Sequence, residues 1–68
     1  MNYKLINVVV NINQDQFGGR DRETEICISE DKEKLEAYCQ KTYGQSAINP
    51  DKFSYDYYKI AETQTIIL

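Results

Sequence analysis

Residues 3–12 alternate between two faces in the way that a β-strand requires, because successive side chains of a strand point to opposite sides. The even positions form an unbroken β-branched row of Ile6, Val8, Val10 and Ile12. The odd positions mix apolar and polar residues: Tyr3, Leu5, Asn7, Val9 and Asn11. We therefore predict a strand whose even row faces the core and whose odd face is only partly exposed to solvent, as in a central strand.

A second strand is predicted over residues 23–28. One face holds Thr24, Ile26 and Ile28, and the other holds Glu23, Glu25 and Cys27. The Gly18–Gly19 pair indicates a turn between the two strands. A two-residue turn at this pair would put the Glu25 carboxylate into the core row, since paired residues share a face. We therefore expect a loop of three or five residues, which pairs Val10 with Ile28 and Ile12 with Ile26.

Residues 30–43 carry the repeat of an amphipathic helix. The positions at i, i+3, i+4 and i+7 are Leu35, Tyr38, Cys39 and Thr42. Ser29 suits the N-cap and Gly44 suits the C-terminal cap. Tyr38 and Tyr43 are expected on the core side of this helix. On its outer face the spacing predicts the ion pairs Glu30–Lys34 and Lys32–Glu36.

A loop and a third strand are predicted after this helix. Residues 44–54 contain the only proline and read as a loop, which Ile48 and Phe53 are expected to anchor to the core. Residues 55–68 are rich in β-branched and aromatic residues and read as a strand. A bulge near Ala61 and Glu62 would bring the apolar positions of this strand onto one face.

The order strand, strand, helix, strand predicts a single small α+β domain over residues 1–68 with ββαβ topology. A right-handed crossover lays the third strand parallel to the second. The third strand then pairs beside the first, which gives a three-stranded antiparallel or mixed sheet of order 2-1-3. One helix packs on one face of this sheet, and no element is left to cover the other face.

Composition narrows the classes of function. The chain has 68 residues, a net charge of −3 and no histidine. It therefore has no imidazole base and no Cys–His or Ser–His pair. Two cysteines fall short of the roughly four ligands that a structural zinc site needs, and no phosphate-binding glycine motif is present. We expect no enzymatic activity, no cofactor and no metal.

Cys27 and Cys39 bear on location and on covalent pairing. We expect no signal peptide from the N-terminal pattern, and the longest apolar run is far below the roughly 20 residues of a membrane span. We therefore expect a cytoplasmic protein with two reduced thiols and no membrane partner. Cys39 lies on the buried stripe of the predicted helix, whereas Cys27 is expected to face away from the core. These opposite placements argue against a disulfide between them.

Charge is distributed unevenly along the chain. Residues 23–36 carry six acidic residues and two lysines, a local net charge of −4. The predicted acidic patch consists of Glu23, Glu25, Glu30, Asp31 and Glu33. Such a patch favours a basic partner and repels phosphate groups. A solvated helix face is the alternative interpretation.

Tyrosine is the unusual residue of this chain, with six in 68 positions. Tyrosine is enriched in the centres of protein interfaces. On the uncovered sheet face we expect a protein-contact surface formed by Tyr3, Leu5, Val9 and Tyr57. The chain then reads as a non-enzymatic protein-interaction module that self-associates, for example as a homodimer, or binds another protein. Scattered surface aromatics are the alternative.

Residues 26–39, ICISEDKEKLEAYC, and residues 57–63, YYKIAET, resemble small strand-helix-strand proteins of bacteria and their phages. The resemblance is one of pattern, and the long Asn- and Gln-containing first hairpin departs from it. It implies a second hypothesis, a small acidic inhibitor of a host nucleic-acid-binding protein. A third hypothesis is a single-stranded nucleic-acid binder that stacks bases on exposed tyrosines. The net charge of −3 argues against nucleic acid as a partner.

Overall fold

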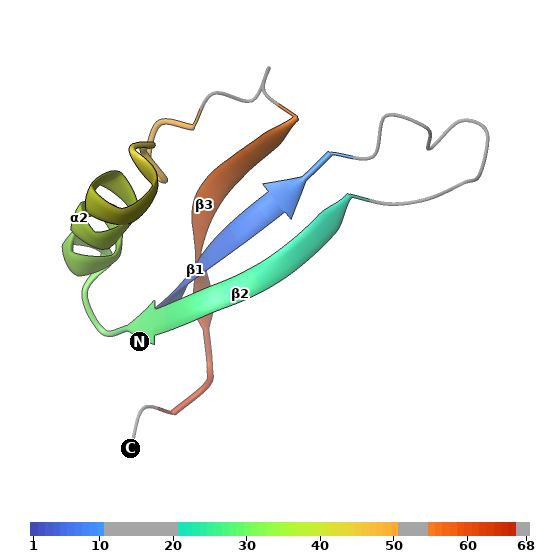
Figure 1. The fold of residues 1–68 in the computed structure, drawn as a ribbon. Helices are drawn as coiled ribbons and strands as arrows, with labels where there is room; N and C mark the ends of the chain where they lie inside the picture. Colours follow the sequence, from blue (N-terminus) through green and yellow to red (C-terminus); the bar gives the residue numbers. More distant parts are fainter. Residues whose placement is uncertain (11–20, 51–54, 67–68) are drawn as a thin grey trace.

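The computed structural model describes residues 1–10, 21–50 and 55–66. Four elements follow one another along the chain: β1 (Asn2–Val9), β2 (Arg22–Ser29), α2 (Lys32–Tyr43) and β3 (Asp56–Thr63). The strands form one sheet of order β2-β1-β3 in which both pairs are antiparallel (Figure 1). β2 and β3 therefore run parallel to each other on either side of β1. The predicted α+β fold, the strand order and the parallel course of β2 and β3 are confirmed.

Local hydrogen bonds fix both ends of α2. The Asp31 side chain is the N-cap and accepts a hydrogen bond from the backbone N–H of Glu33 at 2.9 Å. Ser29, the predicted cap, instead accepts from the N–H of Asp31 at 3.1 Å. At the other end Gly44 has φ 69°, and its N–H donates to the carbonyl of Gln40. A left-handed residue at this position is the usual reason for a glycine cap.

The pairing of β1 with β2 contains a bulge that the alternation did not predict. Leu5 lies opposite Cys27, but the next residue, Ile6, lies opposite Glu25. Ile26 is the extra residue on β2. The odd-numbered residues of β2 therefore change faces at Ile26: Cys27 shares the face of Leu5, whereas Glu25 shares the face of Ile6. The expected Val10–Ile28 pair is wrong, because Ile28 lies opposite Lys4. The expected pairing of Ile12 and the form of the loop lie outside the described residues.

β3 pairs with β1 without interruption, from Asn2 opposite Thr63 to Val9 opposite Asp56. The bulge expected near Ala61 and Glu62 is therefore absent from the described ladder. The strand also ends earlier than predicted, at Thr63. Beyond it, the Asn2 side-chain amide donates to the carbonyl of Thr65 at 2.6 Å.

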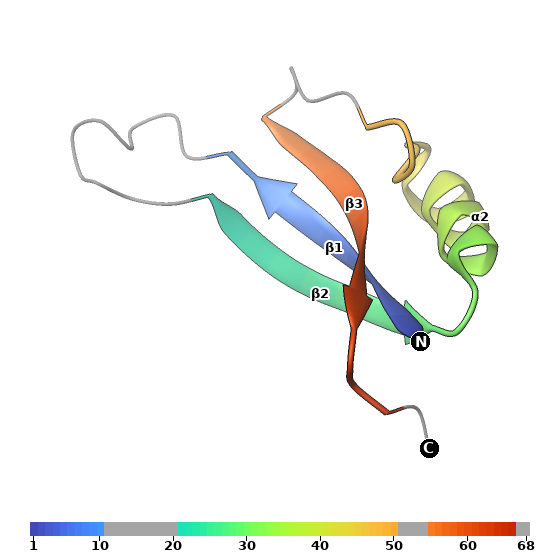
Figure 2. The same cartoon turned by 180° about the vertical axis from the view of Figure 1, so that it is seen from behind.

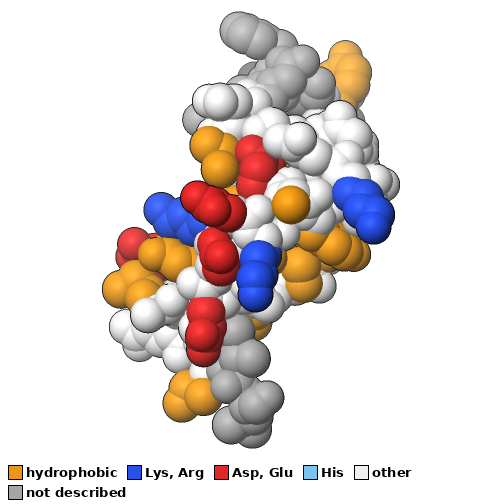
Figure 3. All heavy atoms as spheres, turned by 90° about the vertical axis from the view of Figure 1, so that its left-hand side faces the viewer, with side chains coloured by type: hydrophobic (Ala, Val, Ile, Leu, Met, Phe, Trp, Pro, Cys, Tyr) orange, Lys and Arg blue, Asp and Glu red, His pale blue; other side chains and the backbone are white. Residues whose placement is uncertain are grey.

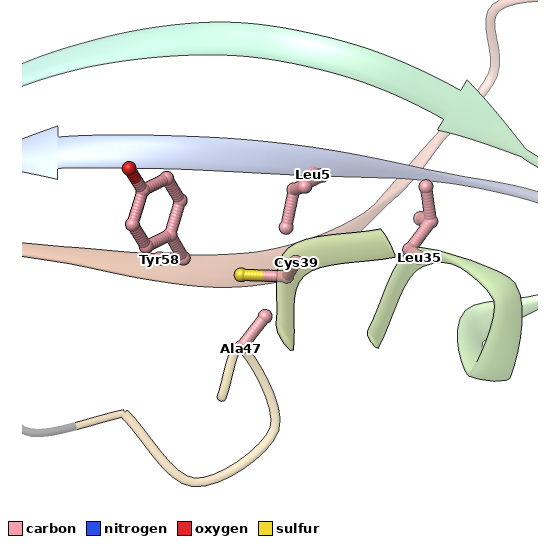
Figure 4. Packing of buried hydrophobic residues seen from close by; sticks show 5 residues of the cluster. All are labelled: Leu5, Leu35, Cys39, Ala47 and Tyr58. Carbon is pink, nitrogen blue, oxygen red and sulfur yellow. The ribbon is translucent and has the colours of Figure 1, made fainter. Parts of the chain in front are cut away.

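The helix packs on the odd face of β1, not on the even row. The buried cluster between helix and sheet consists of Leu5, Leu35, Cys39, Ala47 and Tyr58. In Figure 4, Leu5 points from β1 toward Cys39, and the Tyr58 ring lies beside them. The predicted core face of the first strand is thus wrong. The physical reason is that Leu5 shares its face with Ile60 of β3 and Cys27 of β2. Together these three residues form an apolar surface on which the helix packs.

The even row of β1 is buried on the opposite face by a different means. Ile6 and Val8 are 3% and 1% exposed. Lys59 lies opposite Ile6, and its Nζ lies 3.3 Å from the Glu23 carboxylate on the far edge strand. Its alkyl chain therefore crosses the central strand, where such a stem shields apolar side chains from water. Figures 1 and 2 show no helix on this face among the described residues.

Glu36 attaches the segment after α2 to the helix. Its carboxylate accepts hydrogen bonds from the Ser46 hydroxyl at 2.6 Å and from the Ala47 N–H at 2.7 Å. Ala47 is thereby held in the core at 5% exposed, whereas Ile48, the expected anchor, is 55% exposed. The expected Lys32–Glu36 pair is absent because Glu36 bonds this segment instead. Phe53, the other expected anchor, lies outside the described residues.

Candidate protein-contact surface

The four residues of the predicted contact surface do not gather on one exposed face. Leu5 is fully buried in the core, and Tyr3 packs against that core. The Lys32 ammonium lies 5.0 Å from the centroid of the Tyr3 ring, at the edge of a shallow hollow. Val9 is 41% exposed on the helix side of the sheet, and Tyr57 is half-buried on the opposite side. The predicted placement is therefore wrong: on the helix side Leu5 is buried, Tyr3 is partly buried and Val9 is exposed.

The predicted acidic patch is also divided. Glu25 and Glu23 face away from the helix and form ion pairs with Lys4 at 2.9 Å and Lys59 at 3.3 Å. A register that places these carboxylates beside Ile6 and Val8 is tolerated because lysines neutralise them. The other three residues, Glu30, Asp31 and Glu33, lie at the start of α2, where Asp31 is the N-cap. Carboxylates at the N-terminus of a helix stabilise the helix by interacting favourably with its dipole, so a structural role accounts for these residues.

Three tyrosines lie in a row from the helix onto the sheet. The rings of Tyr43 and Tyr58 stack with centroids 4.5 Å apart, at an interplanar angle of 19°. Tyr38 meets Tyr43 edge-on, with centroids 6.2 Å apart. Tyr58 lies opposite Asn7, and Val9 is the next residue of β1 on that same face. We call Tyr38, Tyr43, Tyr58 and Val9 the tyrosine surface.

The tyrosine surface is partly open to solvent. Tyr38 is 44% exposed and Tyr43 is 37% exposed, whereas Tyr58 beneath them is 8% exposed. The expected core placement of Tyr38 and Tyr43 is therefore wrong. The buried stripe of α2 is narrow and holds only Leu35 and Cys39. The two helix tyrosines flank this stripe. Figure 3 shows hydrophobic side chains on both sides of the acidic side chains on this side of the molecule.

Two phenol groups of this surface, those of Tyr43 and Tyr58, have a raised pKa. Desolvation raises the pKa of Tyr43, and its interactions with Tyr38 add to that effect. Desolvation and the nearby Asp56 carboxylate raise the pKa of Tyr58. Since tyrosine ordinarily titrates near pH 10, a raised pKa keeps each hydroxyl as both donor and acceptor. The surface thus offers ring area together with polar tips, a combination typical of interfaces.

Both cysteines belong to the helix side of the sheet. Cys39 is fully buried in the core cluster, and Cys27 packs against that cluster from its place opposite Leu5. The predicted outward orientation of Cys27 is wrong, because the bulge at Ile26 reverses the face. Both thiols are free in the structure. Desolvation raises the pKa of each, which keeps the thiols protonated and weakly reactive.

In the described parts of the chain, no group of three or more Cys, Asp or Glu residues is arranged to hold a metal ion. Within the same residues, no helix has the length and apolar character needed to cross a membrane. Comparison of the chain with protein-family models, curated proteins and solved structures finds no match.

The sequence contained a signal for the tyrosine surface that periodicity alone did not separate from the core. Tyr38 is three residues after Leu35 and one before Cys39, so it lies at the margin of the buried stripe. Tyr43 is one residue before the helix-ending Gly44. Large amphipathic side chains at a stripe margin or at a helix end commonly keep their polar tip in water. The contact with Tyr58 required the tertiary structure.

Proposed function

We propose that the protein is a non-enzymatic protein-interaction module and that the tyrosine surface is its contact site. The observation that carries this proposal is the aromatic row itself, in which the buried Tyr58 ring stacks on Tyr43 and Tyr43 in turn meets Tyr38 edge-on. A rigidly supported ring loses little conformational freedom on binding, because tyrosine has only two side-chain torsions and its stacking already restricts them. The partner is a second copy of the chain or a different protein.

The exposed ring area is large enough to anchor an interface. A tyrosine side chain buries roughly 150–250 Å² when fully covered, so rings that are about 40% exposed each offer on the order of 60–100 Å². Val9 extends the same apolar face along β1. Interfaces are commonly dominated by a few such aromatic anchors surrounded by weaker contacts.

The sheet face away from the helix is less suited to this role. Its central residues, Ile6 and Val8, are already shielded, and the side chains around them form the pairs Lys4–Glu25 and Lys59–Glu23. A partner would have to separate these pairs to reach the apolar row, which adds a desolvation cost. The proposal includes the cytoplasmic location expected from the cysteine usage.

The double variant Tyr38→Ala/Tyr43→Ala tests this function. Its matched control is Tyr55→Ala, which removes a tyrosine that is 71% exposed and lies outside the tyrosine surface. Sedimentation velocity over a range of concentrations measures self-association, and quantitative capture from the source cell measures other protein partners. We expect the parent and Tyr55→Ala to associate equally and the double variant to lose the association.

Circular dichroism on the same samples checks that the double variant is folded. If its association equals that of the parent by both methods, the tyrosine surface is not the contact site. If the parent neither self-associates nor captures any protein in a tyrosine-dependent way, the proposed function is wrong.

A further inference from the structure

The two edge strands of the sheet differ in how open they are to a further strand. An edge strand presents backbone N–H and C=O groups that can pair with another chain, and bulges or charges oppose such pairing. β2 is interrupted by the bulge at Ile26, and its first half carries Arg22, Glu23 and Glu25. β3 contains no proline, and its pairing with β1 is uninterrupted. β3 is therefore the edge better suited to accept another strand.

The hydrogen-bonding pattern shows which backbone groups of β3 point outward. One step beyond the last pair of the ladder, the N–H of Val10 donates to the carbonyl of Tyr55 at 2.7 Å. Along an antiparallel pair, residues that bond the neighbouring strand alternate with residues whose backbone groups point away from it. The backbone groups of Tyr57, Lys59 and Ala61 therefore face β1. Those that point to the outer edge belong to Asp56, Tyr58, Ile60 and Glu62.

The outer edge of β3 is unpaired within the described part of the chain. None of its outward groups donates or accepts a hydrogen bond among these residues, and β3 is the outermost strand on its side of the sheet in Figures 1 and 2. Asp56 and Glu62 are exposed, and Ile60 is half-buried. Tyr58 is buried chiefly through its ring, which stacks against Tyr43. A further strand can satisfy these unpaired groups.

We infer that β3 pairs antiparallel with β3 of a second copy, centred on Ile60, so that one sheet continues through both copies. The addition of a strand to a sheet edge is a recurring mode of protein recognition. This inference deepens the proposed function, and it rests on that function for the expectation that the chain associates with protein. It names the partner and the strand that binds it. Tyr58 belongs both to this edge and to the tyrosine surface, so the two contacts adjoin.

The charges of β3 select the register. A two-fold axis perpendicular to the sheet brings the outward rows of the two strands together and keeps their faces on the same side. Centred on Lys59, the pairing would oppose Lys59 to itself and Asp56 to Glu62, and like charges directly opposite each other are destabilising. Centred on Ile60, it opposes Ile60 to itself and Tyr58 to Glu62, and no like charges lie directly opposite each other.

Other features of the two edges favour a closed pair of copies. Lysine on an edge strand commonly discourages pairing, but Lys59, the single cation of β3, extends across β1 to Glu23 at 3.3 Å and so turns away from the outer edge. Joining β3 to β2 of the next copy would leave an open edge at each end and extend into a filament. The bulge at Ile26 opposes that arrangement. Pairing of β3 with β3 uses the same edge on both copies and closes the assembly.

Sedimentation velocity and amide hydrogen exchange on the full chain test the inference. We expect the parent to form a dimer by about 0.1 mM, as a modest interface would. As the concentration rises, the outward amides of Tyr58, Ile60 and Glu62 should become protected from exchange. The inward amides of β3 should be protected at every concentration, because they already bond β1.

A proline at position 62 removes one outward donor. In the inferred register the N–H of Glu62 donates to the carbonyl of Tyr58 in the second copy, and Glu62→Pro deletes that bond twice by symmetry. An outward N–H on an edge strand is a position where a sheet tolerates proline. Glu62→Ala is the matched control, since it removes the same side chain but keeps the N–H. We expect the dimer to weaken about tenfold or more with proline and less than about threefold with alanine. Thermal unfolding checks that both variants are folded.

Opposite charges at the centre of the pairing give a second readout. Ile60→Lys or Ile60→Glu alone would place like charges opposite each other, so each variant should stay monomeric at about 0.1 mM. An equimolar mixture should recover a dimer with an affinity within about tenfold of the parent. Circular dichroism confirms that each variant is folded before mixing.

Several outcomes would overturn the pairing of β3 with a second copy. These are a parent that stays monomeric, outward amides that gain no protection, equal effects of Glu62→Pro and Glu62→Ala, and a mixture of folded Ile60 variants that does not dimerise. If Glu62→Pro does not fold, the amides and the Ile60 mixture decide. Capture of a different protein by a monomeric parent, sensitive to Glu62→Pro, would show another occupant and also overturn the second copy.

The failure of this inference is distinguishable from that of the proposed function. The proposed function stands without the β3 pair if protein association is lost in Tyr38→Ala/Tyr43→Ala. If the β3 dimer forms but neither it nor any captured protein depends on these tyrosines, the pairing stands and the tyrosine surface is not the contact site.

Discussion

The two faces of the sheet bury apolar residues of one central strand by different means. On the helix side, Leu5 is covered by Leu35 and Cys39 of α2 and by Ala47 of the following segment. On the other side, Ile6 and Val8 are equally inaccessible. The side chains beside them include the ion pairs Lys4–Glu25 and Lys59–Glu23. One face is closed by packing and the other is bordered by charge.

This difference shows why an uncovered sheet face need not be a binding face. Long charged side chains can cover apolar residues with their stems while their ends remain in water. The accessible apolar area lies instead at the border of the helix-covered face, where Tyr38 and Tyr43 extend beyond the packed core. The partner surface is thus better sought where packing ends than where a helix is missing.

The largest expected effect is on the packed face. Leu5→Ala should lower the free energy of unfolding by about 3 kcal/mol, because it leaves a cavity beneath α2. Val9→Ala, on the same face of the same strand but beyond the helix, should cost less than about 1 kcal/mol. Urea unfolding followed by circular dichroism measures both. Similar losses for the two variants would contradict the assignment of the helix-covered face.

Glu36 tests how the cover of the packed face is held. Glu36→Ala should cost about 1.5 kcal/mol, since the Ser46 hydroxyl and the Ala47 N–H lose their shared acceptor. Glu33→Ala, an exposed acid in the first turn of α2, is the control and should cost less than about 1 kcal/mol. An equal loss for the two variants would show that Glu36 does not hold the segment.

The effect of Glu36 also depends on pH. Desolvation alone would raise the pKa of this carboxyl, but the hydrogen bonds from Ser46, Ala47 and Ile48 outweigh it, and the net pKa is lowered. A folded-state pKa below the unfolded value gives stability that is present above the usual value of about 4.3 and is lost as the pH falls through the lowered pKa. The difference between parent and Glu36→Ala should therefore be constant near neutrality and shrink below about pH 4. A difference that does not change with pH would exclude this charged role.

Lys59 tests the charged face. Lys59→Ala should cost about 1 kcal/mol, because it removes both the stem across β1 and the ion pair with Glu23. Lys59→Met keeps most of the stem without the charge and should cost less than about 0.5 kcal/mol. Unfolding in urea at low and high salt compares them. If Met is as damaging as Ala, the ion pair rather than the stem protects Ile6 and Val8.

The smallest expected effect on stability is at the tyrosine surface. Tyr38→Ala should change the free energy of unfolding by less than about 1 kcal/mol, because the lost edge contact with Tyr43 is partly offset by the better helix propensity of alanine. The same denaturation experiment measures it. A loss close to that of Leu5→Ala would place Tyr38 in the core and remove it from the accessible surface.

The sequence alone could not predict most of the candidate site. Tyr38 and Tyr43 were assigned to the core because periodicity locates a stripe but not its width, and the stripe proved to be only Leu35 and Cys39. The predicted contact role of Leu5 was wrong because the face of β1 that carries Leu5 is the one covered by the helix.

By itself, the sequence determined the elements and their order. Local signals were sufficient for the helix with Leu35 and Cys39 on its buried stripe and for the cap at Gly44. The order of the elements, together with the connection rule for parallel strands, was sufficient for a sheet of order β2-β1-β3. The tertiary structure alone decided which face of β1 meets the helix. β1 has apolar residues at both parities, Leu5 on one face and Ile6 on the other, so alternation cannot distinguish them. The choice depends on long-range pairing: the bulge at Ile26 brings Cys27 to the helix side and the glutamates of β2 to the face where lysines pair with them.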